Sequence, residues 1–292
     1  MTSSGAKASE RSTGAWRYLL LVAPSLAVLA LFFLLPLADM FMRSFEHFVA
    51  YGDPKPGFTL DNYAKFVGDS FYRLTLGKTL TLGAVVAAVS LVIGFPMAYA
   101  IVRARSGMRA FLTVIVLVPL MTSVIVRSYG WMILLGESGP IPSLIAALGL
   151  PRPRLMYTFA GTVIALVQVM MPFMVLTLAA AIQRISPTLE DASRNLGASR
   201  LRMFMDVILP LSLPGIAAGT VLVFSLSISA FATPVLIGGA SVKVVATVVF
   251  EQALTVINWP FASATSFLLM AVTLLLAFAQ ARLVAWSSRW AR

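Results

Sequence analysis

The sequence predicts an all-α membrane protein with six transmembrane helices, and three observations lead to this fold class. Hydrophobic residues make up 59% of the 292 residues and charged residues only 11%, whereas soluble domains carry about 25% charged residues. The apolar residues gather in six runs, each close to the roughly 20 residues that a helix needs to cross a bilayer. Basic residues are concentrated in alternate connections between these runs, as in multi-pass membrane proteins.

Polar, glycine-containing or proline-containing connections separate the six predicted transmembrane helices. These helices cover residues 18–41, 79–102, 110–135, 157–182, 215–237 and 261–284. The first follows a small, polar and basic tail at 1–17, and its apolar stretch is longer than the core of a signal peptide, so we expect it to be retained. A second short tail covers 285–292. Residues 58–71 predict a surface helix, and the apolar stretch 141–150 is too short to span, so it predicts an interfacial helix.

The distribution of charge predicts the orientation of the chain. Six spans place both termini on one side, and the segments on that side hold thirteen basic and four acidic residues. The segments on the other side hold eight basic and seven acidic residues. Because basic connections stay in the cytoplasm, both termini and the connection between the fourth and fifth spans are expected there. This asymmetry accounts for the formal net charge of +11 without a nucleic-acid partner.

The connection that begins at Ser186 predicts a short amphipathic helix. Ser186 can cap this helix, and Pro187 occupies its first position, where a missing N–H group costs nothing. Glu190 and Arg194 are spaced to form an ion pair across one turn. Three apolar residues fall on one face at spacings of three and four, namely Leu189, Ala192 and Leu196.

A second short helix is expected after a bend at Gly197. Glycine is the residue most favoured just beyond the end of a helix, and Ser199 can cap the helix that follows. We expect Pro210 and Pro214 to end this second helix. An ordinary amphipathic loop resting on the membrane surface is an alternative interpretation of this whole connection.

The connection also carries a motif, E-x-A-x4-G-x10-I-L-P, formed by Glu190, Ala192, Gly197, Ile208, Leu209 and Pro210. This motif resembles the EAA signature of permease subunits in binding-protein-dependent ABC importers, with Asp191 where the family usually has Ala. The resemblance implies the type I importer permease fold, in which residues 186–210 form a cytoplasmic coupling helix that docks on an ATPase. It implies polar contacts with the ATPase from Glu190, an apolar docking face from Ala192 and Leu196, and a bend at Gly197.

Three further stretches are similar to the spermidine/putrescine branch of that family: FTLDNYAKFV at 58–67, FATPVLIGG at 231–239 and NWPF at 258–261. The better-studied polyamine permeases carry an acidic residue just before the Phe-x-Thr-Pro stretch, where this chain has Ala230. The resemblance implies import of a polyamine. An amino acid, an opine or another organic cation is the alternative solute.

The same resemblance implies the partners of the chain. They are two cytoplasmic ABC ATPase subunits, a second homologous permease that forms a heterodimer, and an extracytoplasmic solute-binding protein, assembled in a bacterial inner membrane with its lipid. The sequence by itself does not distinguish a heterodimer from a homodimer.

No catalytic residue is expected in this chain. It has no Gly-x4-Gly-Lys-Ser/Thr loop to hold phosphates, so ATP and Mg²⁺ would be used by the partner ATPase, and we expect no cofactor on this chain. No cysteine and a single histidine, His47, leave no thiolate or His-based metal site. A secondary transporter or channel is a second hypothesis, but it predicts acidic or histidine relays within the spans. A membrane-embedded enzyme would require a clustered nucleophile and base, which the spans lack.

Two polar residues inside the predicted spans are candidates for the solute path. Arg127 is a charged residue inside the third predicted span, and it either lines a polar cavity or extends to the membrane interface. Asp39, near the outer end of the first span, is a candidate partner for it. Gln168 lies in the middle of the fourth span and either contacts solute or bonds a neighbouring helix.

The fifth span supplies the remaining candidates, Ser229, Phe231 and Thr233. Pro234 predicts a kink and Gly238–Gly239 a break, and a broken helix at membrane depth is tolerated where it lines a water-filled cavity. The serines at 225, 227 and 229 recur at every second position and so cannot share one helical face. Close packing of helices through small hydroxyl residues is the alternative role.

Overall fold

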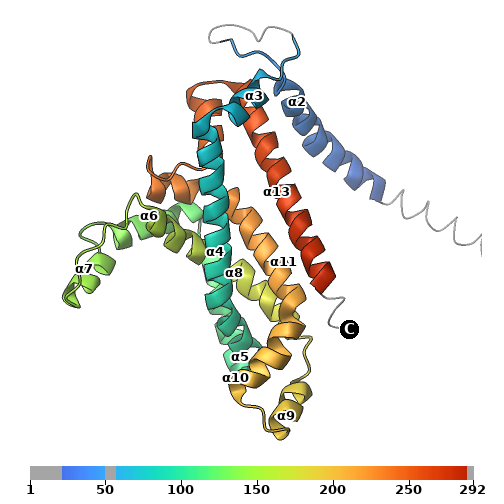
Figure 1. The fold of residues 1–292 in the computed structure, drawn as a ribbon, viewed down its shortest axis with the longest axis vertical. Coiled ribbons are helices and arrows are strands. Elements are labelled where there is room, and N and C mark those ends of the chain that lie inside the picture. Colours follow the sequence, from blue (N-terminus) through green and yellow to red (C-terminus); the bar gives the residue numbers. More distant parts are fainter. Residues whose placement is uncertain (1–21, 50–56, 288–292) are drawn as a thin grey trace, which may run out of the picture.

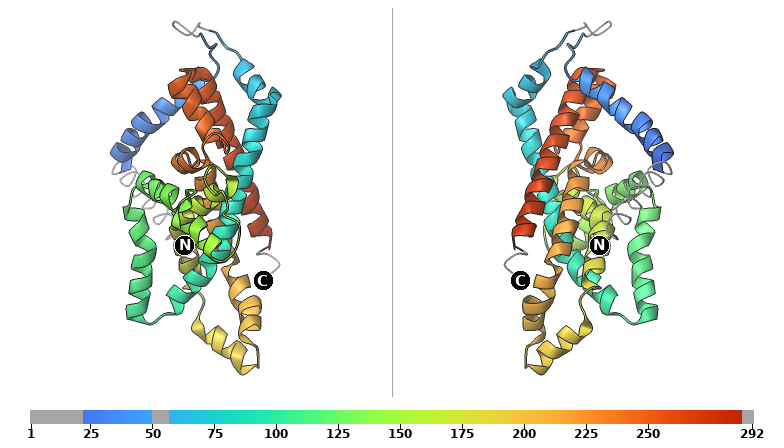
Figure 2. Two further views of the ribbon diagram at one scale, coloured as in Figure 1. Left: turned by 90° about the vertical axis from the view of Figure 1, so that its left-hand side faces the viewer. Right: turned by 90° about the vertical axis from the view of Figure 1, so that its right-hand side faces the viewer.

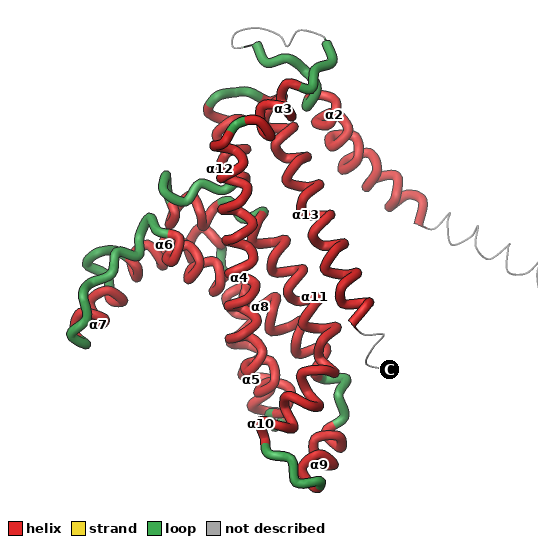
Figure 3. The backbone as a smooth tube through the Cα atoms, in the orientation of Figure 1, coloured by secondary structure: helices red, strands yellow, loops and turns green. Residues whose placement is uncertain are grey.

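The computed structural model describes residues 22–49 and 57–287, and within these ranges the chain is helical with no strand (Figure 3). Five helices are long and apolar enough to cross a membrane: Val22–Arg43, Ser70–Arg103, Phe159–Ile182, Arg200–Ile228 and Trp259–Gln280. A bent pair of helices, Ser106–Met121 and Val124–Ala147, forms a sixth crossing if it is counted as one span. The six-helix membrane fold class is therefore confirmed, with its third crossing broken. The tail predicted at 1–17 lies outside the described residues.

Three helices form the core of the bundle and run side by side: α4 (Ser70–Arg103), α8 (Phe159–Ile182) and α11 (Leu209–Ile228) (Figure 1). Their facing side chains are buried, including Leu82, Val86, Leu166, Met174, Leu178, Val223 and Ile228. Apolar lipid provides no hydrophobic force that pushes helices together, so close packing through small residues holds such bundles. Gly219 of α11 meets this need, since a Cβ atom there would lie 2.8 Å from the sulfur of Met174.

The first and last described helices lie outside this core. The helix Val22–Arg43 contains η1 (Ala30–Leu34) and α2 (Leu35–Arg43), and it leans away from the bundle (Figure 1). It contacts α13 (Trp259–Ser287), where the rings of Phe41 and Phe267 lie 5.1 Å apart, edge to face.

One end of the bundle is covered by α3 (Asp61–Gly68), within the surface helix predicted over 58–71, and by α12 (Val245–Phe250) and η5 (Glu251–Thr255) (Figures 1 and 3). The aromatic rings of Phe66, Tyr72 and Phe261 pack together there.

The single helix predicted over 110–135 is wrong. The chain instead forms α5 (Ser106–Leu117), a 3₁₀ turn η2 (Val118–Met121) and α6 (Val124–Leu135), and the two halves are bent by 98°. Pro119 cannot donate a backbone hydrogen bond, and Thr122 and Ser123 are extended. Ser123 then caps a new helix by accepting a hydrogen bond from the Ile125 N–H group, 3.3 Å away. The short helix predicted over 141–150 is α7 (Pro140–Ala147).

The expectation that Pro210 and Pro214 end a helix is also wrong. The chain stays helical through α10 (Arg200–Met203), the π turn η3 (Phe204–Ile208) and α11. A proline ring clashes with the carbonyl four residues earlier in a regular α-helix. Here the Leu209 N–H group donates to the Phe204 carbonyl, five residues back, and the wider turn admits Pro210.

The helix instead ends at Ile228, before the predicted kink. The backbone leaves helical geometry at Ala230 and Phe231 and resumes as η4 (Pro234–Gly238). The span predicted over 215–237 is thus interrupted near one end. Both interruptions in predicted spans, at Thr122–Ser123 and after Ile228, lie in the same part of the molecule, where α6 and η4 are in contact.

Candidate functional site

The connection between α8 and α11 forms the extreme end of the molecule, opposite α3 and α12 (Figures 1 and 2). Its first helix, α9 (Pro187–Asn195), is capped by Ser186, whose hydroxyl accepts from the Thr188 N–H group at 3.3 Å. Ser199 caps the next helix by accepting from the Arg202 N–H group at 3.2 Å. Gly197 lies between them with φ +83°, a conformation that costs side-chain-bearing residues about 1–2 kcal/mol. The conformation of this loop is therefore determined largely by neighbouring residues along the chain, through two helix caps and one glycine bend.

The carboxylate of Glu190 points into the protein, and only 6% of this residue is exposed. Its Oε2 accepts a hydrogen bond from the Tyr99 hydroxyl at 2.7 Å, and its Oε1 accepts one from the Arg103 Nε–H group at 2.7 Å. The Arg103 Nη2 group also donates to the Ile185 carbonyl at 3.1 Å. The ion pair expected between Glu190 and Arg194 is therefore not formed, because the carboxylate turns towards α4.

The opposite face of α9 is open. Leu189, Ala192 and Leu196, the three apolar residues predicted to share a face, are all exposed, and 90% of Leu196 is accessible. Asp191 is also exposed, as is Pro210 on the following helix. The loop therefore presents apolar side chains outwards and holds its glutamate inwards, a division that suits docking of another protein on the outer face.

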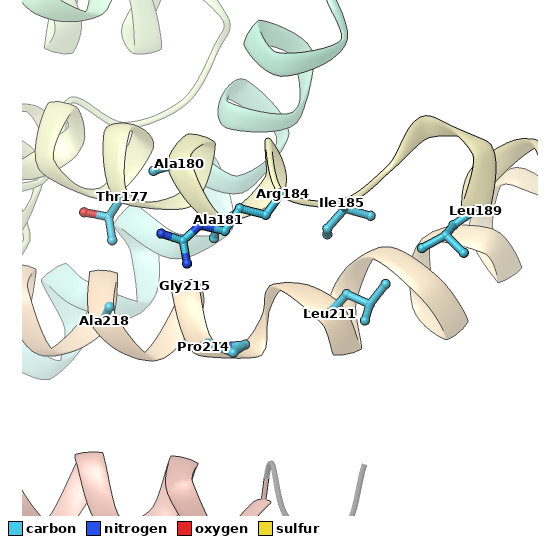
Figure 4. Close-up of a pocket in the computed structure, with 10 residues that line it drawn as sticks. All are labelled: Thr177, Ala180, Ala181, Arg184, Ile185, Leu189, Leu211, Pro214, Gly215 and Ala218. Atoms are coloured by element: carbon cyan, nitrogen blue, oxygen red, sulfur yellow. The ribbon is translucent and has the colours of Figure 1, made fainter. Parts of the chain in front are cut away.

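A groove of about 470 Å³ lies between this loop, the C-terminal end of α8 and the N-terminal end of α11 (Figure 4). Leu189 of α9 and Leu211 of α11 line one end of it, and Arg184 lies at the foot of α8. The two core helices approach closely here, since a Cβ atom on Gly215 would lie 2.2 Å from that of Ala181. A displacement of α9 would therefore change the packing of both α8 and α11.

A second cavity, of about 720 Å³, opens where the two interrupted spans meet. Residues of the α5–α6 break, of α8 and of the α11–η4 break line it: Leu120, Met121, Thr122, Ser123, Val124, Arg127, Leu166, Val169, Met170, Phe173, Leu226, Ala230, Phe231, Ala232 and Thr233. Irregular backbone at membrane depth is tolerated where it borders such a cavity. Three of the predicted path residues, Arg127, Phe231 and Thr233, are thus brought together.

Arg127 is the one charged residue in this lining. Its Nε and Nη1 atoms are buried and have no hydrogen-bond partner among the described residues. Asp39, its candidate partner, instead bonds Arg43 on the same helix at 2.7 Å. Arg127 therefore brings a positive charge to the cavity wall, while these two nitrogen atoms are enclosed by the protein.

The other predicted path residues lie in different surroundings. The Thr233 hydroxyl is hydrogen-bonded to that of Ser128 at 3.2 Å, which joins η4 to α6. The Gln168 carbonyl oxygen accepts from the Trp131 Nε1–H group at 3.3 Å, so it links α8 to α6, as the interhelical alternative predicted. Ser229 is exposed at the end of α11 and is not part of the cavity lining.

The sequence alone does not predict that Tyr99 and Arg103 of α4 contact Glu190 in the α9 loop. In the sequence, Arg103 counts only as one basic residue in a short loop, and Tyr99 is an ordinary aromatic residue of a predicted span. The one available signal was that the basic loop and the loop around Glu190 are predicted on the same side of the membrane.

Comparison with known proteins identifies the family. Residues 90–289 match the model of the binding-protein-dependent transport system inner membrane component, and this stretch is more than half of the chain. The chain belongs to this family. It is therefore a permease subunit, and the loop at 186–210 and the cavity beside Arg127 lie within the matched region.

Curated relatives support this assignment. The chain is 34% identical over 217 residues to the spermidine/putrescine transport system permease protein PotB of Salmonella typhimurium, covering 74% of this permease and 75% of that one. It is 32% identical over 265 residues to PotB of Haemophilus influenzae, covering 90% and 88%.

Among solved structures, the permease resembles a bacterial ABC transporter involved in the import of the acidic polysaccharide alginate. The TM-score is 0.75 at 20% identity, with 96% of this chain and 98% of that chain covered. The MetNI methionine ABC transporter matches with a TM-score of 0.58 at 19% identity, over 75% and 99%. These likenesses establish the ABC importer permease fold.

Proposed function

We propose that this permease forms half of the transmembrane path of an ATP-driven importer for polyamines such as putrescine and spermidine. The observation that carries this proposal is the cavity of about 720 Å³ between two interrupted spans, in a chain of the importer permease family. The names of the PotB relatives supply the solute class.

Energy reaches this path from a partner. In the proposal, two cytoplasmic ATPase subunits use ATP and Mg²⁺, and one of them docks on the loop at 186–210 through Leu189, Ala192 and Leu196. Closure of the ATPases pushes α9, and the helices rock between outward and inward openings by alternating access. The exposure of these apolar residues on the outer face of α9 supports this arrangement.

In this proposal the chain lies in a bacterial inner membrane with both termini and α9 in the cytoplasm, an orientation that the excess of basic residues at the α9 end favours. An extracytoplasmic solute-binding protein then delivers solute at the opposite end, where α3 and α12 lie. The alginate transporter, solved in complex with a periplasmic protein bound to an alginate pentasaccharide, offers a precedent for this kind of partner.

A polycation requires negative charge along its path, and the cavity lining of this chain contains Arg127 and no acidic residue. We therefore propose that a second, different permease supplies the carboxylates, which makes the assembly a heterodimer. Arg127 also gives a reason to retain a second candidate function, import of a carboxylate-bearing solute such as an amino acid, because its positive charge in the cavity lining suits an oxyanion.

The test begins with the solute-binding protein that works with this permease. It is purified and titrated with putrescine, spermidine and a panel of amino acids, and uptake of the tightest ligand is then measured in proteoliposomes with and without ATP. Tight polyamine binding with ATP-dependent uptake is expected. Tight binding of an amino acid would replace the solute but keep the importer, whereas uptake driven by an ion gradient without ATP would overturn the importer mechanism.

A further inference from the structure

Glu190 belongs to the motif that the family resemblance linked to contact with the ATPase, but its carboxylate is directed away from the exposed face of α9. Both of its oxygens are bonded within the chain, at 2.7 Å to Tyr99 and at 2.7 Å to Arg103. Because the residue is only 6% exposed and each carboxylate oxygen already accepts a hydrogen bond inside the chain, Glu190 presents little accessible surface to a docking partner.

Arg103 is the last residue of α4, and its guanidinium joins α4 to α9 and to the connection that follows α8. It bonds Glu190 of α9, it donates to the Ile185 carbonyl just beyond α8, and it lies 5.9 Å from the centre of the Tyr99 ring on its own helix. A planar guanidinium can make such forked contacts, whereas a lysine ammonium acts as a single point charge.

A second contact attaches the same loop to the same helix. Phe204, in the π turn that follows α10, packs edge to face against Phe95 of α4 with ring centres 5.3 Å apart. The loop is thus fixed to α4 at both of its halves, by a polar contact at Glu190 and an aromatic contact at Phe204, although α8 and α11 are the helices it connects.

The end of α4 that lies away from α9 is fixed to α12 and α13. The Thr79 hydroxyl, which is fully buried, accepts a hydrogen bond from the Val245 N–H group of α12 at 2.9 Å. Tyr72 packs on Phe261 at the start of α13, with ring centres 5.0 Å apart. One helix of 34 residues therefore contacts both the α9 loop and the segments at the other end of the molecule.

From these contacts we propose that Tyr99 and Arg103 are positioning residues that lock the coupling loop to α4, so that α4 carries the movement of α9 across the membrane to α12. The two sides of α9 then have different roles. Its outer face binds the ATPase, and Glu190 on its inner side transmits the displacement of α9 to α4. This inference rests on the proposed coupling to an ATPase and goes beyond it by assigning the transmitting helix and its contact residues.

The experiment uses the assembled transporter in proteoliposomes and compares Arg103→Gln, Tyr99→Phe and Glu190→Gln with the control Arg105→Gln, a basic residue of the same short loop that is exposed. Solute uptake per ATP hydrolysed is expected to fall at least about fivefold in Arg103→Gln and Glu190→Gln and less in Tyr99→Phe, which leaves the ion pair intact. The ATPase is expected to co-purify with every variant. The exchange of both charges, Arg103→Glu with Glu190→Arg, is expected to restore part of the ratio.

A second measurement makes the result independent of the solute. Because the chain has no cysteine, spin labels can be placed by Leu74→Cys at the far end of α4 and Met121→Cys beside the cavity, both on exposed residues. ATP is expected to change the distance between these labels in the assembled transporter and in Arg105→Gln, but not in Arg103→Gln.

Three results would overturn the inference. One is an unchanged ratio of uptake to hydrolysis in Arg103→Gln and Glu190→Gln. Another is loss of the ATPase from Glu190→Gln but not from Arg103→Gln, which would place Glu190 in the docking surface. The third is an ATP-dependent label distance that survives Arg103→Gln. Absence of ATP-dependent uptake in the unaltered transporter would instead count against the proposed function, and the label distances would still decide the role of α4.

Discussion

Gly83 of α4 lies directly against Ile228, the last residue of α11 before the chain breaks beside the cavity. A Cβ atom on Gly83 would lie 2.4 Å from the Ile228 Cγ2 atom, and Ile228 is fully buried. The absence of a side chain at one position therefore sets where the interrupted end of α11 sits against the core. Gly77, on the same helix, differs, because a Cβ atom there would meet no other side chain or helix within 4 Å.

This pair predicts opposite effects for the same substitution. Gly83→Ala is expected to destabilise the permease by about 1–3 kcal/mol through overpacking, even though alanine favours helix formation. Gly77→Ala is expected to leave stability unchanged or raise it slightly. Thermal unfolding in detergent measures both, and equal unfolding temperatures for the two variants would contradict the close packing of α4 on α11.

Gly197 predicts a conformational requirement in the coupling loop. The φ angle of +83° gives Gly197→Leu a backbone strain of about 1–2 kcal/mol, whereas an added Cβ atom would have no other atom within 4 Å. Uptake per ATP hydrolysed is expected to fall, because strain relieved by moving the bend changes the direction of α9. Gly197→Asn is the control, since asparagine tolerates the left-handed region. Normal coupling in Gly197→Leu would mean that the bend plays no part in transmission.

The outer face of α9 predicts an ATPase contact at Leu196, which is 90% exposed. Leu196→Glu is expected to weaken binding of the ATPase by about 2 kcal/mol or more, because an ionised carboxylate without a partner is costly to bury in an apolar contact. Co-purification of the two subunits at graded salt and detergent concentrations measures the loss. Leu144→Glu, on an exposed leucine of α7 at a different part of the molecule, is expected to have no effect. Retention of the ATPase by Leu196→Glu would exclude Leu196 from the interface.

Arg127 predicts an electrostatic effect on solute selectivity. For an assumed separation of about 8 Å between a positively charged solute in the cavity and the guanidinium, removing the cation would lower their repulsion by about 2 kcal/mol at an effective dielectric constant of about 20. Arg127→Gln is therefore expected to lower the KM for putrescine uptake by up to about 30-fold. Arg43→Gln, at an exposed arginine paired with Asp39, serves as the control. A rise in KM would instead indicate that Arg127 binds an anionic group of the solute.

The orientation of the chain predicts opposite accessibility for two introduced cysteines. Gly107→Cys lies beside the basic loop at the α9 end, and Leu144→Cys lies on α7; both positions are exposed. A membrane-impermeant maleimide is expected to label Leu144→Cys in intact spheroplasts and Gly107→Cys only in inverted vesicles. The native sequence contributes no competing thiol. The reversed pattern would place the termini outside.

The sequence determined by itself those features that depend on neighbouring residues along the chain. Apolar runs of near-spanning length give the helices of the bundle, because a spanning segment must satisfy its own backbone hydrogen bonds. Ser186, Gly197 and Ser199 form the caps and bend expected of them, since each acts on a backbone group within three residues or through its own φ angle. The prolines were less informative: Pro119 lies in a broken span, whereas Pro210 is accommodated by a π turn.

Only the tertiary structure decided which distant residues meet. Glu190 bonds Arg103, 87 positions away, and Tyr99, 91 positions away, rather than the arginine one turn along its own helix. The same holds for the cavity, whose walls come from breaks near residues 122 and 230. The physical reason is that removing a carboxylate from water is costly unless a cationic group and hydrogen-bond donors are buried beside it. That partner is set by how α4, α8 and α11 pack, which no local pattern in the sequence records.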